Sequence, residues 1–211
     1  TETRVNLTPV DIGADAFSGT PPVINSFTPT SGGTGTLVTI SGSNLTGATI
    51  VRFGGTSASS FTVVNASTIT AVVGSGSSGS VSVTTGGGSA SLAGFTYLTA
   101  PVVSSFSPTA AGTGTTITIS GSNFTGATVV RFGGTAASSF TVVNASTITA
   151  AVGSGASGAV RVITPGGTDS LVGFTFIPGP VIGSFTPVTA GAGTTVTITG
   201  NNFNGATAVS F

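Results

Sequence analysis

Few residues of this 211-residue chain could carry out chemistry, because its only charged side chains are four arginines and four acidic residues. It contains no His and no Cys, so His-based acid–base or metal sites, thiolate nucleophiles and Cys-based zinc sites are absent. Asp11 and Asp15 are the closest pair of carboxylates. Their surroundings lack the alternating Asp/Asn ligands and the bidentate Glu of a calcium loop, which favours solvated turn residues. We predict no catalytic site, no metal and no cofactor.

Two glycine-rich segments, 74–79 and 153–158, match the pattern G-x-G-x-x-G. A dinucleotide site with this pattern also needs a following helix and an acidic residue about 20 positions further on. The first segment is followed instead by the alternating residues Val81-Ser82-Val83, which predict a strand. We therefore interpret both segments as hairpin loops.

The composition also excludes several kinds of partner. Four arginines balanced by four acids cannot form the basic patch that nucleic acid or an anionic membrane requires. The longest apolar runs, such as 71–73, are far too short for a membrane-spanning helix. We predict no binding to nucleic acid and no membrane insertion.

An internal repeat of 79 residues organises the chain. When residues 22–100 are aligned with 101–179, 23 of the 79 positions differ and 56 are identical. A third copy begins at Pro180 and contributes 32 residues, 180–211. We expect the polypeptide to continue beyond Phe211, with completion by strands of another chain as the less favoured alternative.

Within each copy, apolar residues alternate with small or polar ones, as they do in half-buried strands. In the first copy these runs lie at 23–28, 38–40, 51–53, 61–63, 69–73, 81–83 and 95–97. Glycine-rich turn segments separate them, at 31–33, 41–44, 54–55, 74–76 and 86–88. About seven short strands per copy are typical of an immunoglobulin-like β-sandwich. We predict an all-β chain of tandem sandwiches with almost no helix.

The motifs of the repeat resemble those of the IPT/TIG family of immunoglobulin-like domains. The resemblance rests on segments that recur with small changes in the next copy: 22–32 (PVINSFTPTSG), 38–45 (VTISGSNL), 51–55 (VRFGG) and 95–97 (FTY). It implies the fold, but members occur in receptors, bacterial surface proteins, phage virions, carbohydrate-active enzymes and Rel-type transcription factors. The shortage of basic residues argues against the last.

Charged residues in the repeats are rare enough to be considered one by one. Arg52 and Arg131 are each flanked by apolar residues, so alternation should turn them outward. We predict that they are exposed edge contacts that discourage strand pairing, with ligand binding as the alternative. Arg161 and Asp169 occur only in the second copy, where we expect a local ion pair.

Residues 1–21 have no counterpart between later copies and hold four of the eight charges. Two interpretations remain open. The segment could be a flexible leader, since chain ends are commonly disordered. Alternatively, it could anchor the chain by adding extended backbone to a neighbouring subunit. In that case the candidate assembly residues are Arg4, Asp11, Asp15 and Phe17.

Asn-x-Ser/Thr sequons occur at Asn44, Asn65, Asn123 and Asn144, with a proline-flanked case at Asn6. In a chain so rich in Ser and Thr such matches arise by chance, so they indicate glycosylation only weakly.

The copies are joined by short linkers that contain proline, at 98–101 and 177–180. Proline fixes φ, so these linkers allow little independent tumbling and predict a semi-rigid rod. Nearly identical copies in series suit a spacer. We predict domains at 22–100 and 101–179, a truncated one at 180–211, and an N-terminal segment at 1–21. With so little charge, hydroxyls and backbone must solvate the rod, and its stability should depend little on salt.

We therefore predict a non-enzymatic fibre or stalk protein on an exterior surface, with a role in attachment. A bacteriophage virion fibre or decoration protein is favoured, because no signal peptide precedes the distinct N-terminal segment. The alternatives are a bacterial cell-surface adhesin or extracellular filament stalk, and an accessory module of a secreted glycan-active enzyme with a row of exposed aromatics. The expected partners are other subunits of an oligomeric virion or surface assembly and a host-surface glycan or protein.

Overall fold

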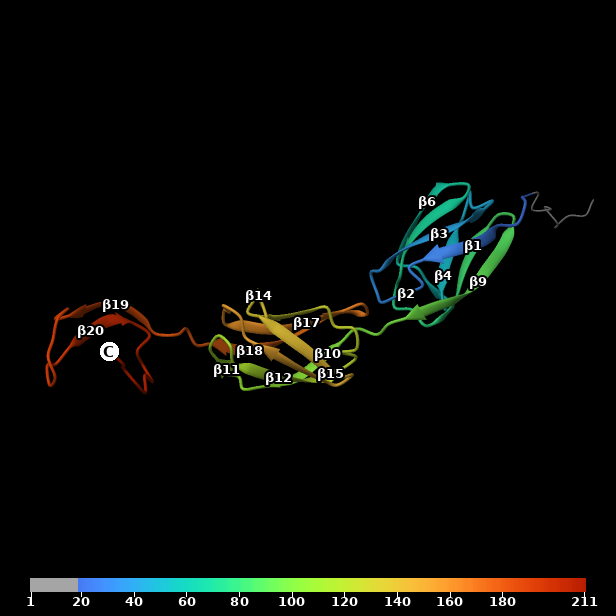
Figure 1. Cartoon of the computed structure of the whole chain (residues 1–211). Helices are drawn as coiled ribbons and strands as arrows, with labels where there is room; N and C mark the ends of the chain where they lie inside the picture. Colours follow the sequence, from blue (N-terminus) through green and yellow to red (C-terminus); the bar gives the residue numbers. More distant parts are fainter. Residues whose placement is uncertain (1–18) are drawn as a thin grey trace, which may run out of the picture. The chain divides into compact units, whose positions relative to one another are not determined.

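The computed structural model describes residues 19–211, and every regular element in that range is a β-strand (Figure 1). The candidate assembly residues Arg4, Asp11, Asp15 and Phe17 lie outside the described residues. No helix that could span a membrane occurs within 19–211. The chain divides between Thr99 and Ala100 into two compact units, which are described separately.

Repeat 1 is a sandwich of two sheets. One sheet has the strand order β1-β3-β7-β6 and the other has the order β2-β9-β8-β4-β5. The strands are β1 (Val23–Thr28), β2 (Ser31–Gly32), β3 (Leu37–Ser43), β4 (Ile50–Phe53), β5 (Thr56–Ser57), β6 (Ser60–Asn65), β7 (Thr68–Val72), β8 (Gly79–Thr85) and β9 (Gly88–Tyr97).

Repeat 2 has the same topology, with sheets β10-β12-β16-β15 and β11-β18-β17-β13-β14. Its strands are β10 (Val102–Ser107), β11 (Ala110–Ala111), β12 (Thr116–Ser122), β13 (Val129–Phe132), β14 (Thr135–Ala136), β15 (Ser139–Asn144), β16 (Thr147–Ala151), β17 (Gly158–Thr164) and β18 (Gly167–Phe176). In residues 180–211, β19 (Val181–Thr186) and β20 (Thr197–Asn201) form an antiparallel pair equivalent to β1 and β3.

The seven predicted strands of each complete repeat are confirmed, and two strands of two residues are added. The first, β2, runs parallel to β9 and pairs Ser31 with Thr96 and Gly32 with Tyr97. The prediction of a turn at 31–33 was therefore wrong for Ser31 and Gly32. A strand of two residues has no alternation to detect, so composition alone made this segment look like a turn.

The predicted turn at 41–44 was also wrong in part, because β3 continues to Ser43. Gly42 pairs with Ile24 beside an irregularity in β1, and a Cβ atom at Gly42 would collide with the carbonyl oxygen of Val23. The glycine thus permits a close approach of two backbones within the sheet.

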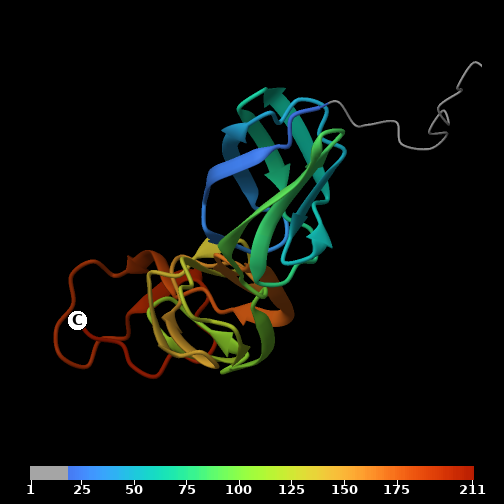
Figure 2. The ribbon, with the colours of Figure 1, turned by 90° about the vertical axis from the view of Figure 1, so that its right-hand side faces the viewer.

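The core between the two sheets of each repeat is built around a phenylalanine cluster. In repeat 1 the ring centroid of Phe95 lies 4.9 Å from that of Phe53 and 6.3 Å from that of Phe27, the latter edge-on. In repeat 2, Phe174 occupies the place of Phe95, with corresponding distances of 5.0 and 6.4 Å. Figure 2 shows the two sheets of repeat 1 as separate layers of strands.

The outer face of the β1-β3-β7-β6 sheet carries rows of hydroxyl groups. The strand register aligns one threonine from each strand: Thr28, Thr39, Thr70 and Thr62. Repeat 2 has the equivalent row Ser107, Thr118, Thr149 and Thr141. Hydroxyls therefore take the place of charge on this solvent-facing surface.

Candidate functional surfaces

The two arginines predicted as edge contacts lie on β4 and β13. Arg52 is exposed and Arg131 is half-buried, while the residues on either side of each are buried. Each of these strands lies second from the edge of its sheet. The edge itself is formed by a strand of only two residues, β5 beside β4 and β14 beside β13. Arg131 Nη1 also donates a hydrogen bond to the carbonyl oxygen of Gly134 at 2.9 Å. A role of either arginine in contact with a partner stays a prediction.

The predicted ion pair between Arg161 and Asp169 was wrong. In the register of β17 and β18, Asp169 lies opposite the buried Val162, one position away from Arg161, so the two side chains belong to opposite faces. Asp169 Oδ2 accepts a hydrogen bond from the backbone N–H of Val103 at 2.7 Å. Arg161 instead lies across from Arg131 on the neighbouring strand.

The two G-x-G-x-x-G segments are loops followed by strands, as predicted, but they are not hairpins. The segment 74–79 connects β7 to β8, which belong to different sheets, and 153–158 connects the equivalent strands of repeat 2. A Cβ atom at Gly76 would lie 3.3 Å from the ring of Tyr97. The glycine therefore leaves space for an aromatic ring to pack on the loop.

Sequence reasoning missed a structural role of the asparagine that follows β3 in each copy. Asn44 and Asn123 have left-handed backbones, with φ of 55° and 58°. Their side-chain nitrogens donate hydrogen bonds to carbonyl oxygens 23 residues earlier, Asn44 to Pro21 at 3.0 Å and Asn123 to Ala100 at 2.9 Å. The recurrence of Asn two residues after a glycine, at 79-residue spacing, was the available indication, since Asn tolerates this backbone region.

The first linker is attached by hydrogen bonds to the repeat on either side of it. On the repeat 1 side, the N–H of Leu98 bonds to the carbonyl oxygen of Gly32 at 3.1 Å. On the repeat 2 side, the carbonyl of Ala100 is held by Asn123. Thr99 is the only residue between these two attachments.

The second linker has the same construction. The N–H of Ile177 bonds to the carbonyl oxygen of Ala111 at 3.0 Å. Asn202, with φ of 60°, donates from its side chain to the carbonyl oxygen of Gly179 at 3.2 Å. Only Pro178 lies between these attachments.

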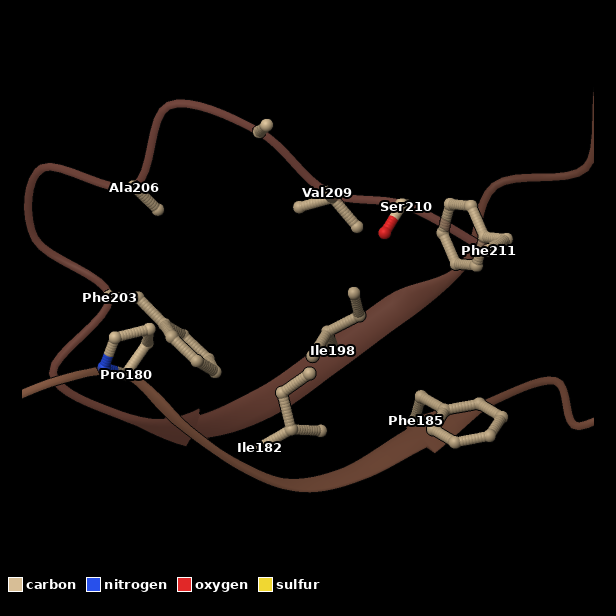
Figure 3. A pocket seen from close by; sticks show the side chains of 10 residues that line it. Pro180, Ile182, Phe185, Ile198, Phe203, Ala206, Val209, Ser210 and Phe211 are labelled. Atoms are coloured by element: carbon tan, nitrogen blue, oxygen red, sulfur yellow. The ribbon is translucent and has the colours of Figure 1, made fainter.

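An apolar hollow of about 610 Å³ lies over the β19-β20 pair (Figure 3). Its apolar lining includes Ile182, Phe185, Ile198, Phe203, Val209 and Phe211. The residues 79 positions earlier, in repeat 2, are all buried in the core: Val103, Phe106, Ile119, Phe124, Val130 and Phe132. The hollow is thus the equivalent of one side of a sandwich core, and we do not interpret it as a ligand site.

The described residues contain no group of three or more acidic side chains that could hold a metal ion. Every phenylalanine and tyrosine between residues 22 and 179 is buried or half-buried. The surface of these two repeats therefore offers a partner hydroxyls and aliphatic groups rather than open aromatic rings.

The family model of the IPT/TIG domain matches residues 22–97, 101–176 and 180–211. The chain belongs to the IPT/TIG domain family. The three matches correspond to the two complete sandwiches and to the segment that carries β19 and β20. No curated protein matches the chain.

Several solved structures are similar to this IPT/TIG chain. SGBP-B from a xyloglucan utilisation locus of Bacteroides uniformis is 24% identical, with a TM-score of 0.37 over 82% of this chain and 57% of its own. The plexin A4 extracellular region is 22% identical, with a TM-score of 0.47 over 86% and 18%. The surface glycan-binding protein PbSGBP-B of Prevotella bryantii is 18% identical, with a TM-score of 0.35 over 72% and 41%. The chain thus spans less than two thirds of these proteins.

Proposed function

We propose that this chain is a non-enzymatic stalk segment of a fibre on an exterior surface. The observation that carries the proposal is the construction of the linkers, each of which leaves one residue between hydrogen bonds to successive repeats. One residue spans at most about 3.6 Å, so such a tether restricts how far neighbouring domains can separate or turn. A restricted string of sandwiches would act as a semi-rigid spacer.

The organisation that we propose has an attachment segment at 1–21, complete repeats at 22–100 and 101–179, and a further repeat beginning at 180. The similarity of the two complete repeats supports a spacer, because 56 of 79 positions are identical and neither repeat carries a distinctive cluster of charged groups. Distal parts of the fibre would then meet the host-surface glycan or protein.

Of the possible settings, we favour a bacteriophage virion fibre or decoration protein, with a bacterial adhesin or filament stalk as the alternative. Antibodies against residues 22–179 would test the exterior location by immunogold labelling of intact virions and intact cells. Label along filaments on either particle would support the proposal and identify the setting. Label confined to the cell interior would overturn it.

The spacer role is tested by small-angle X-ray scattering of the 211-residue chain. A semi-rigid stalk gives a pair-distance distribution with a long tail. Lengthening the linker should broaden that distribution. The matched comparison inserts Gly-Gly-Ser after Thr99, which lengthens the tether without touching either sandwich. If the parent chain and the insertion variant scatter alike, the linkers do not restrict the domains and the spacer proposal fails.

Attachment through the N-terminal segment requires a separate test. Deletion of residues 1–20 should abolish incorporation into the parent assembly while leaving both sandwiches folded. Replacement of Arg4, Asp11, Asp15 and Phe17 by alanine should weaken it. Unchanged incorporation of the deletion variant would show that the segment is only a leader.

A further inference from the structure

The fold separates the described sequons into two classes. Asn44 and Asn123 follow β3 and β12, whereas Asn65 and Asn144 end β6 and β15. All four side chains are exposed, so exposure alone does not distinguish them. What differs is the hydrogen bonding of the side-chain amide.

In the first class the amide nitrogen is already occupied. Asn44 Nδ2 donates to the carbonyl of Pro21, and Asn123 Nδ2 donates to the carbonyl of Ala100. Both asparagines are also fixed in the left-handed backbone region. Each amide nitrogen has a second N–H, but a transferase that binds the amide group would have to displace the contact that holds the start of the repeat.

In the second class the amide oxygen, and not the nitrogen, is engaged. Asn65 Oδ1 accepts hydrogen bonds from both the backbone N–H and the hydroxyl of Ser67, each at 2.8 Å. Asn144 Oδ1 accepts the same pair from Ser146, at 2.8 and 2.9 Å. Among residues 19–211, neither Nδ2 has a hydrogen-bond partner.

The turn that makes these contacts is held in place by the rest of the sandwich. The carbonyl oxygens of Ala66 and Ser67 accept hydrogen bonds from the N–H groups of Leu45 and Gly42, both at 2.9 Å. The same two contacts recur in repeat 2, at 2.9 Å each. The hydroxyl of each serine is thus fixed against the amide before any partner arrives.

This arrangement suits an amide that must act as a nucleophile. An amide nitrogen is weakly nucleophilic because its lone pair is delocalised into the carbonyl group. When Nδ2 gives up a proton, negative charge builds on Oδ1, and two preorganised donors stabilise that charge. The nitrogen meanwhile faces solvent, at the tip of a hairpin where an enzyme can reach it.

We propose that Asn65 and Asn144 are acceptor sites for N-linked sugar in the folded protein, and that Asn44 and Asn123 are not. The co-substrate is a sugar activated by phosphate at its anomeric carbon. The bond from Nδ2 to the anomeric carbon forms as the bond from that carbon to the phosphate oxygen breaks. The bonding pair leaves with the phosphate, and the proton of Nδ2 passes to a base of the transferase.

The test uses the folded 211-residue chain, UDP-glucose and a purified soluble N-glycosyltransferase that recognises Asn-x-Ser/Thr. Tandem mass spectrometry of chymotryptic peptides then locates each added hexose. We expect hexose at Asn65 and Asn144, with modification of Asn44 and Asn123 slower by about tenfold, since a hydrogen bond must first break. Absence of hexose at Asn65 and Asn144, or equal rates at all four sites, would overturn the proposal.

One control separates the effect of the fold from the effect of local sequence, and a second tests the requirement for a hydroxyl group at residue 67. Short peptides spanning 40–48 and 61–69 lack the fold, so the preference for Asn65 over Asn44 should disappear in them; persistence of the preference would refute the structural explanation. Ser67→Ala removes the hydroxyl donor, whereas Ser67→Thr keeps it. Loss of transfer at Asn65 in the first variant and retention in the second, with Asn144 as internal reference, is the expected result.

Discussion

The side-chain amide of Asn123 donates a hydrogen bond of 2.9 Å to the backbone carbonyl of Ala100, 23 residues earlier in the chain. Ala100 immediately precedes Pro101, which is buried at the start of repeat 2. The contact therefore holds the entry of the chain into the sandwich. Asn44 makes the same contact with Pro21 in repeat 1, so each complete repeat holds the carbonyl of the residue that immediately precedes it.

Replacing Asn123 with alanine should destabilise repeat 2 by about 2 kcal/mol, because the variant loses a hydrogen bond and places a residue other than Asn or Gly in the left-handed region. Asn123→Gly relieves the backbone strain and should cost only about 1 kcal/mol. Native-state hydrogen exchange of repeat 2 amides measures both values, with repeat 1 as internal reference. Equal losses in the two variants would show that backbone strain contributes nothing.

Replacing Gly121 with alanine should destabilise repeat 2 by about 1 to 3 kcal/mol, the usual range for overpacking. A Cβ atom there would overlap the carbonyl oxygen of Val102 and lie 2.6 Å from the ring of Phe124. Gly191→Ala is the matched control, because no atom lies within 4 Å of its Cβ position. Urea denaturation followed by circular dichroism compares the two variants. A loss of similar size in both would refute the role of close approach.

Asp169→Ala should cost about 1.5 kcal/mol, since it leaves the N–H of Val103 without its charged acceptor. Asp169→Asn retains an acceptor oxygen and should recover part of that stability. Repeat 1 has Ala90 at the equivalent position, so the alanine variant recreates a side chain that the fold tolerates. Denaturation midpoints provide the measurement, and an unchanged midpoint for Asp169→Ala would contradict the contact.

Arg161→Ser should leave stability unchanged or raise it by about 0.5 kcal/mol, because Arg161 lies directly across from Arg131 and like charges in that position repel. In repeat 1 the residue equivalent to Arg161 is Ser82, which lies opposite Arg52. The effects of Arg161→Ser and Asp169→Ala should be additive in the double variant, as expected for side chains on opposite faces. Strong coupling between the two substitutions would indicate an ion pair between Arg161 and Asp169 and would contradict the structure.

The sequence predicted the core well because alternation reports directly which side of a strand is buried. The alternation at 38–40 predicted a half-buried strand, and its apolar residues Val38 and Ile40 are fully buried, while Arg52 was predicted to point outward and is exposed. Seven strands per repeat followed from the same alternation. The fold class was therefore accessible from local pattern alone.

Contacts that depend on register or on distant backbone could not be predicted in this way. Asp169 and Arg161 are eight residues apart, but the tight turn between Thr164 and Gly167 sets a register that pairs Arg161 with Ser170 and Asp169 with Val162, which places them on opposite faces. The role of Asn123 depends on a carbonyl 23 residues away that only the folded sandwich brings close. From residue type alone, Arg161 and Asp169 suggested an ion pair and Asn123 suggested a glycosylation sequon. The fold instead gives Asp169 a contact with the backbone of another strand and Asn123 a contact with the linker.

The unfolding midpoint of the chain should change little between dilute buffer and molar NaCl. The repeats between 22 and 211 carry only four charged side chains, Arg52, Arg131, Arg161 and Asp169, and hydroxyl rows cover the outer face of one sheet. Salt screens interactions between exposed charges and leaves hydroxyl hydration largely unaffected. Arg161→Glu is the control, because it places a carboxylate across from Arg131 and creates an attraction that salt can weaken. The Arg161→Glu variant should lose stability on addition of salt, whereas the parent chain should not. A strong dependence of the parent's midpoint on salt would contradict the prediction that charge contributes little to its stability.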